Sequence, residues 1–128
     1  MARIATIVLV VRDLEAALAL YETQVGLERV EGPSDVPSLG ARHAVLRAQD
    51  CLVELLEPRD EGMPPALFLR ARGEGVFSVA LELEDPVAAR ERLRGAGIEP
   101  RGPAGHLGRW WLPPGEAFGI LLRAGPPD

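Results

Sequence analysis

Four polar residues interrupt segments that are otherwise apolar, and they form two pairs at similar spacing. Ser78 follows Thr6 by 72 positions, and Arg123 follows Glu54 by 69 positions. A guanidinium bonds a carboxylate through two parallel N–H donors, so Glu54 and Arg123 could form an ion pair flanked by two hydroxyl groups. We therefore treat Glu54 and Arg123 as candidate catalytic residues, and Thr6 and Ser78 as candidate ligand-binding residues.

The elements that carry these residues occur twice in the same order. The apolar and β-branched pattern predicts strands at 4–11, 27–32, 40–47, 50–57, 76–83, 109–112 and 118–123. Helices are predicted over about 14–24, capped by Asp13 and closed by Gly26, and over 86–94, capped by Asp85. The segment G-P-S-D-V-P-S-L-G is expected to be a turn, and 58–74 a connector with a short helical turn.

This order predicts an α+β fold in a single domain. Two tandem βαβββ modules, at about 3–58 and 75–124, would form one curved mixed sheet with a central cavity and helices outside. Because strand neighbours point to opposite faces, the four polar residues fall on the cavity side, together with Val8 and Val10. The expected helix side comprises Ile7, Leu9, Val11, Val53, Leu55, Phe77, Val79, Leu81, Ile120 and Leu122.

Composition excludes several classes of function. All 14 basic residues are arginine, so lysine Schiff-base chemistry and a P-loop lysine are ruled out. The net charge of −5, with both signs interspersed, argues against a nucleic-acid surface. No apolar run is long enough to span a membrane, and the N-terminus lacks a signal-peptide profile. The single cysteine, Cys51, cannot form an internal disulfide, so we expect a cytoplasmic protein.

Three further residues are candidates for ligand binding. Trp110 and Trp111 must point to opposite faces of their strand, so one should pack in the core and the other could form a flat cavity wall for a planar ligand. His43 lies on the middle strand of the first module and is either structural or ligand-binding. It is 63 positions from His106, and the two do not form a metal-binding motif.

The segment V-V-R-D-L-E-A-A-L-A-L-Y-E-T-Q-V-G-L-E resembles the opening strand and helix of the vicinal oxygen chelate superfamily, which includes glyoxalases, bleomycin resistance proteins and extradiol dioxygenases. The similarity covers essentially the whole chain. It is closest to the methylmalonyl-CoA epimerase-like branch, through V-E-L-L-E-P at 53–58, V-A-L-E-L-E-D-P at 79–86 and L-P-P-G-E-A-F-G-I-L-L at 112–122.

The resemblance implies that metal-dependent members place four ligands at the four polar positions. Histidines would stand at Thr6 and Ser78, a Gln or Glu at Glu54, and a glutamate at Arg123. Only Glu54 is retained, and Arg123 reverses the charge. A divalent metal needs several converging imidazole or carboxylate donors, so we expect no metal cofactor. The arginine charge would then substitute for the lost cation.

Two functions remain open. The first is a metal-independent protein that binds a small organic molecule in the cup between its modules. The second is an epimerase, isomerase or lyase that transfers a proton next to a thioester or carbonyl, with Glu54 as base and Arg123 as oxyanion partner. The acid that epimerases carry before their middle strand corresponds to Ser38. A third possibility retains a weak metal on Glu54 and His43.

Simpler interpretations also stand for individual residues. Arg123 is close to Gly125 and the chain end, so it can be a solvated surface charge. Glu54 can be a relic of the family's ligand, and Thr6 and Ser78 can be hydroxyls that line a cavity without a chemical role. By analogy with the family, we expect a homodimer.

Overall fold

The computed structural model describes residues 2–127, which form two compact units. One unit comprises residues 6–77. The other comprises residues 78–127 together with the first residues of the chain. Both units combine strands with helices in the order that the sequence predicted, and the α+β fold is confirmed.

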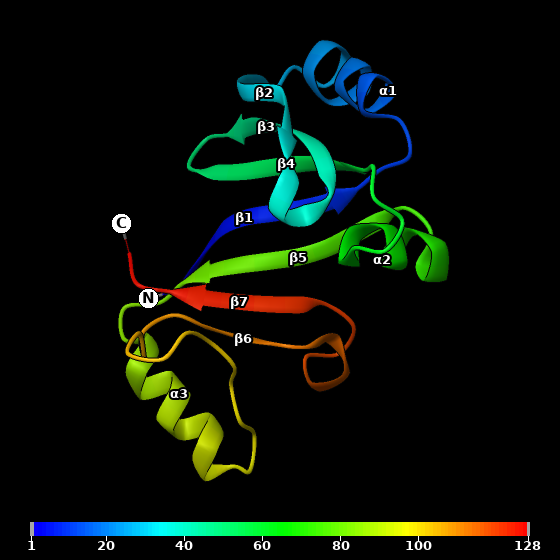
Figure 1. Cartoon of the computed structure of the whole chain (residues 1–128). Coiled ribbons are helices and arrows are strands. Elements are labelled where there is room, and N and C mark those ends of the chain that lie inside the picture. Colours follow the sequence, from blue (N-terminus) through cyan, green and yellow to red (C-terminus); the bar gives the residue numbers. More distant parts are fainter. Residues whose placement is uncertain (1, 128) are drawn as a thin grey trace. The chain divides into compact units, whose positions relative to one another are not determined.

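The first unit contains four strands. They are β1 (Arg3–Val10), β2 (Glu28–Val36), β3 (Ala41–Ala48) and β4 (Cys51–Pro58), in the sheet order β2-β3-β4-β1 (Figure 1). β1 is parallel to β4, and the other neighbours are antiparallel. The α-helix α1 (Leu14–Leu18) continues as the π-helix η1 (Ala19–Gln24), a 3-10 turn η2 covers Pro37–Leu39, and α2 spans Pro64–Arg72.

The second unit repeats this plan with one strand fewer. It contains β5 (Gly75–Glu82), α3 (Pro86–Gly95), β6 (Trp110–Leu112), the 3-10 turn η3 (Pro114–Glu116) and β7 (Leu121–Gly125), in the strand order β5-β7-β6 (Figure 1). β5 and β7 are parallel. The missing strand is reduced to an isolated bridge between Arg101 and Trp111, because the surrounding prolines and glycines disfavour a ladder.

Both predicted helix caps are confirmed. The Asp13 carboxylate accepts a hydrogen bond from the Ala16 amide at 3.1 Å, and Asp85 accepts one from the Ala88 amide at 2.9 Å. Each cap satisfies one of the free amides that begin a helix. Equivalent caps 72 positions apart therefore start the equivalent helices of the two modules.

The core of the first unit has a layer on each face of its sheet. On one face, Leu9, Val53 and Leu55 pack against Leu14 and Leu18 of α1, as the alternation predicted. On the other face, the core comprises Val8, Val10, Ala41, Leu56, Phe68, Leu69 and Phe77. The prediction that Val8 and Val10 line a cavity is therefore wrong, because the apolar side of α2 covers them.

The core of the second unit lies beneath α3. Ala89 and Leu93 of this helix pack with Leu122, which confirms the predicted helix side of β7. Phe77, which was predicted to pack on the same side, instead makes an edge-to-face contact with Phe68 of α2, with ring centroids 5.4 Å apart. This geometry is favoured for aromatic pairs.

Three elements differ from their predicted lengths. β2 continues through Gly32-Pro33 to Val36, where a turn was predicted, with shifts in its register against β3. The connector contains a full helix, α2, rather than a short turn. The first predicted helix becomes π-helical after Leu18.

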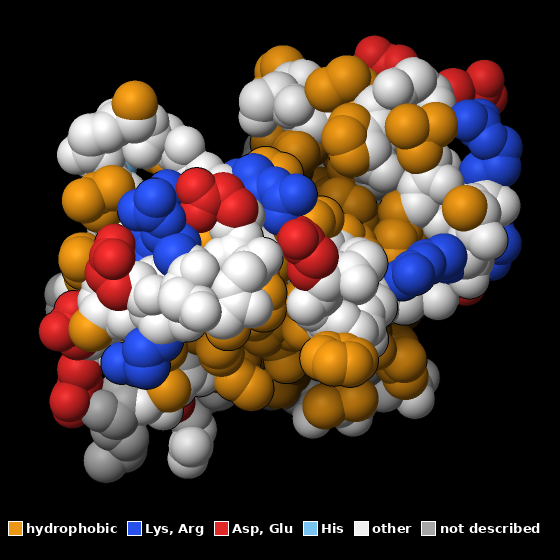
Figure 2. All heavy atoms as spheres, turned by 90° about the horizontal axis from the view of Figure 1, so that it is seen from below, with side chains coloured by type: hydrophobic (Ala, Val, Ile, Leu, Met, Phe, Trp, Pro, Cys, Tyr) orange, Lys and Arg blue, Asp and Glu red, His pale blue; other side chains and the backbone are white. Residues whose placement is uncertain are grey.

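On the face seen in Figure 2, arginine and acidic side chains are interspersed among hydrophobic ones. None of the helices in the described part of the chain has the length and hydropathy needed to cross a bilayer.

Candidate functional site

Glu54 lies beside His43 because β3 and β4 pair in antiparallel register. Val45 is opposite Glu54 and His43 is opposite Leu56, so these side chains share one face of the sheet. His43 Nδ1 is 2.5 Å from Glu54 Oε2. The pairing of β1 with β4 places Thr6 on the same face, two residues before Val8, which is opposite Glu54. From the sequence, His43 and Glu54 were candidates with separate roles, and the fold brings their side chains into contact.

A second carboxylate approaches the other side of the imidazole. Glu31, which lies opposite Val45 on β2, places its Oε2 atom 2.9 Å from His43 Nε2. The side chains of His43 and Glu54 are mostly buried, and that of Glu31 is mostly exposed. Each of the two contacts needs one hydrogen, and a neutral imidazole carries only one N–H. The tautomer of His43 decides which ring nitrogen donates.

Gly32 fixes the approach of β2 to His43. It adopts a φ of +86°, and a Cβ at this position would lie 2.4 Å from the His43 carbonyl oxygen and 2.9 Å from the Ala44 Cα. Both the backbone conformation and the contact therefore require glycine. The residue holds Glu31 and His43 at hydrogen-bonding distance.

We expect Gly32→Ala to lower the free energy of unfolding by about 1–3 kcal/mol, because the added methyl group displaces β2 from β3. Urea denaturation measures this loss. Gly95→Ala is the matched control, since a Cβ there meets nothing within 4 Å and its φ is not in the left-handed region. Equal stability of the two variants would contradict the role given to Gly32.

Arg123 lies beside Trp111 in the second unit. The two residues are directly opposite in the β6–β7 pairing, and Ala80 of β5 is opposite Arg123 on its other side. They line a cavity of about 300 Å³ together with Arg109. Trp110 points the other way, is buried, and donates its indole N–H to the Pro86 carbonyl at 2.9 Å. The prediction that one tryptophan packs in the core is confirmed by Trp110. Both tryptophans belong to the cavity lining, and Trp111 is the one whose side chain is exposed.

The two predicted hydroxyls have different surroundings. Thr6 is half-buried, whereas Ser78 is 2% exposed and lies opposite Leu121. Glu54 and Arg123 belong to different units, and their ion pair stays a prediction.

The sequence analysis did not identify Glu31 and Arg109 as site residues. Arg109 could have been predicted, because it precedes Trp111 by two positions on a predicted strand and so should share its face.

The four residues at the positions that the resemblance assigns to metal ligands do not make a donor set that fits a divalent cation. Two of the four groups are hydroxyls, and the Glu54 carboxylate already contacts His43. The guanidinium of Arg123 carries a positive charge and offers no lone pair. Zinc and related metals are held by thiolate, imidazole and carboxylate ligands, and the four positions supply only one such group, the Glu54 carboxylate.

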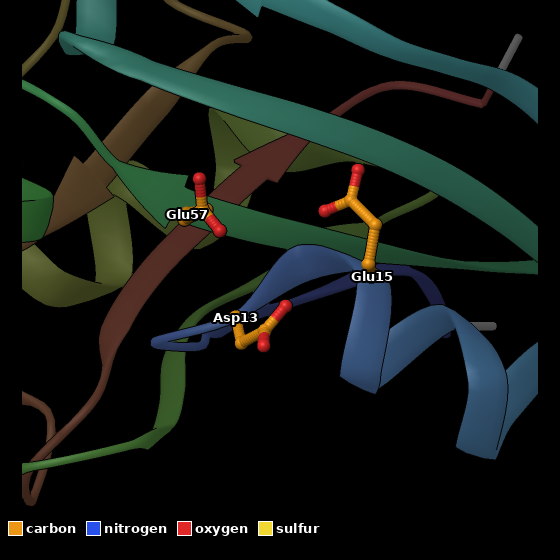
Figure 3. Close-up of side chains that lie close together, drawn as sticks. All are labelled: Asp13, Glu15 and Glu57. Atoms are coloured by element: carbon orange, nitrogen blue, oxygen red, sulfur yellow. The ribbon is translucent and has the colours of Figure 1, made fainter.

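Three carboxylates gather at the start of α1, outside the predicted site. Oxygen atoms of Asp13, Glu15 and Glu57 lie within 4.8 Å of one another (Figure 3). Each already has a protein partner. Asp13 caps α1, Glu57 accepts from the Leu14 amide at 2.8 Å, and Glu15 pairs with Arg42 at 2.8 Å. The hydrogen bond from Arg42 holds the pKa of the Glu15 carboxyl below its usual value. The cluster is thus explained by helix capping and ion pairing.

The chain is similar to proteins of one superfamily along most of its length. The family model described as Glyoxalase/Bleomycin resistance protein/Dioxygenase superfamily matches residues 6–109. An ethylmalonyl-CoA/methylmalonyl-CoA epimerase from Cereibacter sphaeroides is 38% identical over 101 residues, which cover 78% of this chain and 75% of the relative.

Solved structures agree with this match. A hypothetical protein from Bacillus halodurans superimposes with a TM-score of 0.78 at 27% identity, over 99% of this chain and 95% of the other. A Streptomyces coelicolor methylmalonyl-CoA epimerase, in complex with 2-nitronate-propionyl-CoA, gives a TM-score of 0.76 at 26% identity, over 95% of this chain and 92% of the other.

Proposed function

Because the chain belongs to the glyoxalase/bleomycin resistance protein/dioxygenase superfamily, we propose that it is a member that binds a small organic molecule without a divalent metal. The observation that supports this proposal is the chemistry of the four ligand positions, where one carboxylate, two hydroxyls and a guanidinium replace a metal-binding set. The cup between the modules and the homodimer predicted from the family are part of this proposal.

The proposal is tested by thermal unfolding with a panel of acyl-CoA thioesters and aromatic natural products. A ligand present at about 100 times its dissociation constant should stabilise the protein by about 2.7 kcal/mol. The same shift is expected in EDTA and in added Co²⁺, because the metal takes no part in binding. A shift that EDTA abolishes and Co²⁺ restores would refute metal independence.

A second candidate function is an epimerase or isomerase, and two observations favour it. The chain is 38% identical to an ethylmalonyl-CoA/methylmalonyl-CoA epimerase, and Glu54 contacts an imidazole at 2.5 Å. In this reaction the Glu54 carboxylate accepts the proton α to the thioester, and the C–H electron pair moves into an enolate. A proton from solvent then adds to the opposite face and Glu54 releases its proton to solvent, so the carbon is inverted without net change in composition.

The two candidates differ in proton exchange. Methylmalonyl-CoA incubated with the protein in D₂O is followed by proton NMR. An epimerase exchanges the α-proton faster than the uncatalysed reaction, and Glu54→Gln removes this acceleration. A binding protein shifts the thermal midpoint with this or another ligand and leaves the exchange rate at the background value.

A further inference from the structure

We propose that Arg109 and Arg123 form an oxyanion subsite in the second unit, with Trp111 as its flat wall. The subsite takes the carboxylate or phosphate end of a planar organic ligand. This inference rests on the proposed binding of a small organic molecule, and it names the chemical class of that molecule. Three observations carry it: the charge of the cavity, the placement of the two arginines, and the exposed indole.

The cavity contains two guanidinium groups, Arg109 and Arg123, that have no carboxylate partner among the described residues of the second unit. Most other arginines are paired with acidic residues, namely Arg3, Arg12, Arg29, Arg42, Arg47, Arg59, Arg94 and Arg101. Glu82 also lines the cavity, but Arg3 already binds it through two contacts of 3.0 and 2.5 Å. The remaining charge on the lining is positive, so the cavity favours an anion.

The fold directs both guanidinium groups to the same face of the β6–β7 hairpin. Arg123 is opposite Trp111, and Arg109 precedes Trp111 by two positions. Gly125 follows Arg123 by two positions, so it shares the face of Arg123. A Cβ on Gly125 would lie 3.2 Å from Arg109 Nη1, which shows that the Arg109 guanidinium rests over the end of β7. A glycine there leaves room for this side chain.

Trp111 supplies an apolar surface next to the charges. Its side chain is 40% exposed, although a large aromatic residue on a strand is usually covered. Pro103, Ala80 and Pro126 are among the other apolar residues of the lining. A cavity of about 300 Å³ lies at the lower end of the range for small-molecule sites, so it fits one ring with its acid group. The guanidinium group of arginine binds carboxylate and phosphate oxygens in the same manner, through two parallel N–H donors.

Tryptophan fluorescence with matched probes tests the subsite. Benzoate and phenyl phosphate supply the two oxyanions, and benzamide is the uncharged counterpart of benzoate. We expect saturable changes in fluorescence with one or both anions, and at least about tenfold weaker binding of benzamide, because charge-assisted hydrogen bonds are lost. The stronger anion identifies the acid group. In Trp111→Phe most of the fluorescence change should be lost, since Trp110 is buried and its indole N–H is bonded to the Pro86 carbonyl.

Substitutions locate the charge that binds. Arg109→Gln and Arg123→Gln are each expected to raise the dissociation constant of the preferred anion about tenfold. Arg92→Gln removes the same charge from an exposed position on α3 outside the cavity, and it should leave binding unchanged. Far-UV circular dichroism checks that the variants are folded.

The subsite is refuted if benzamide and benzoate bind equally, if no probe binds saturably, or if Arg92→Gln weakens binding as much as Arg123→Gln. These outcomes do not decide the proposed function. A metal-independent ligand found by thermal unfolding would still support that function if its affinity were unchanged in Arg109→Gln and Arg123→Gln. Loss of ligand binding in EDTA would refute the proposed function even where the probes show charge-dependent binding.

Discussion

A triple variant with Thr6→His, Ser78→His and Arg123→Glu is expected to bind about one equivalent of Co²⁺ per chain, whereas the unchanged protein binds none. The substitutions add two imidazoles and a carboxylate to the existing Glu54. If the four positions converge, as the resemblance implies, these groups would form a nitrogen and oxygen donor set of the kind that holds divalent metals. Visible absorption of protein-bound Co²⁺ and dialysis with elemental analysis measure the gain.

The double variant Thr6→His with Ser78→His is the control for charge. It retains the Arg123 guanidinium, which repels a cation, and we expect it to bind Co²⁺ much more weakly than the triple variant. Ser78 is 2% exposed, so an imidazole there will cost about 1–3 kcal/mol of stability through overpacking. Thermal unfolding of both variants therefore accompanies the titration. A folded triple variant without metal affinity would contradict the convergence of these positions.

Leu55→Ala is expected to lower the free energy of unfolding by about 3–5 kcal/mol. Leu55 is fully buried between β4 and α1, and truncation leaves a cavity in the core that includes Leu14 and Leu18. The residue lies next to Glu54 but on the opposite face of the strand. The experiment therefore tests the alternation that directs Glu54 away from the helix. Urea denaturation gives the difference.

Leu52→Ala provides the comparison on the other face. Leu52 is partly exposed and lies two positions from Glu54, so its truncation should cost less than that of Leu55. A larger loss for Leu52→Ala than for Leu55→Ala would mean that the register of β4 is reversed.

The sequence predicted the elements that position most of the candidate site. β1, β4, β5 and β7 are mostly apolar runs of strand length, and the caps at Asp13 and Asp85 mark where α1 and α3 begin. The alternation also placed Leu55 toward α1 and Leu122 toward α3. These features depend on local periodicity, which the sequence contains in full.

What the sequence could not predict depends on contacts between distant segments. β2 passes through Gly32-Pro33 with shifts in register, so counting along the strand cannot place Glu31 beside His43. The two prolines that begin α2 were interpreted as part of a connector, although proline is favoured in the first turn of a helix. Phe77 turns toward α2 because Phe68 is there, and that helix had not been predicted.

Elemental analysis of the native protein, purified without chelators, tests metal independence most directly. We expect zinc, cobalt, manganese and nickel contents far below one equivalent per chain, with no gain on dialysis against each metal. A stoichiometric metal that is lost in Glu54→Gln would contradict metal independence. It would place a cation on the Glu54 carboxylate, which contacts the His43 imidazole in the structure.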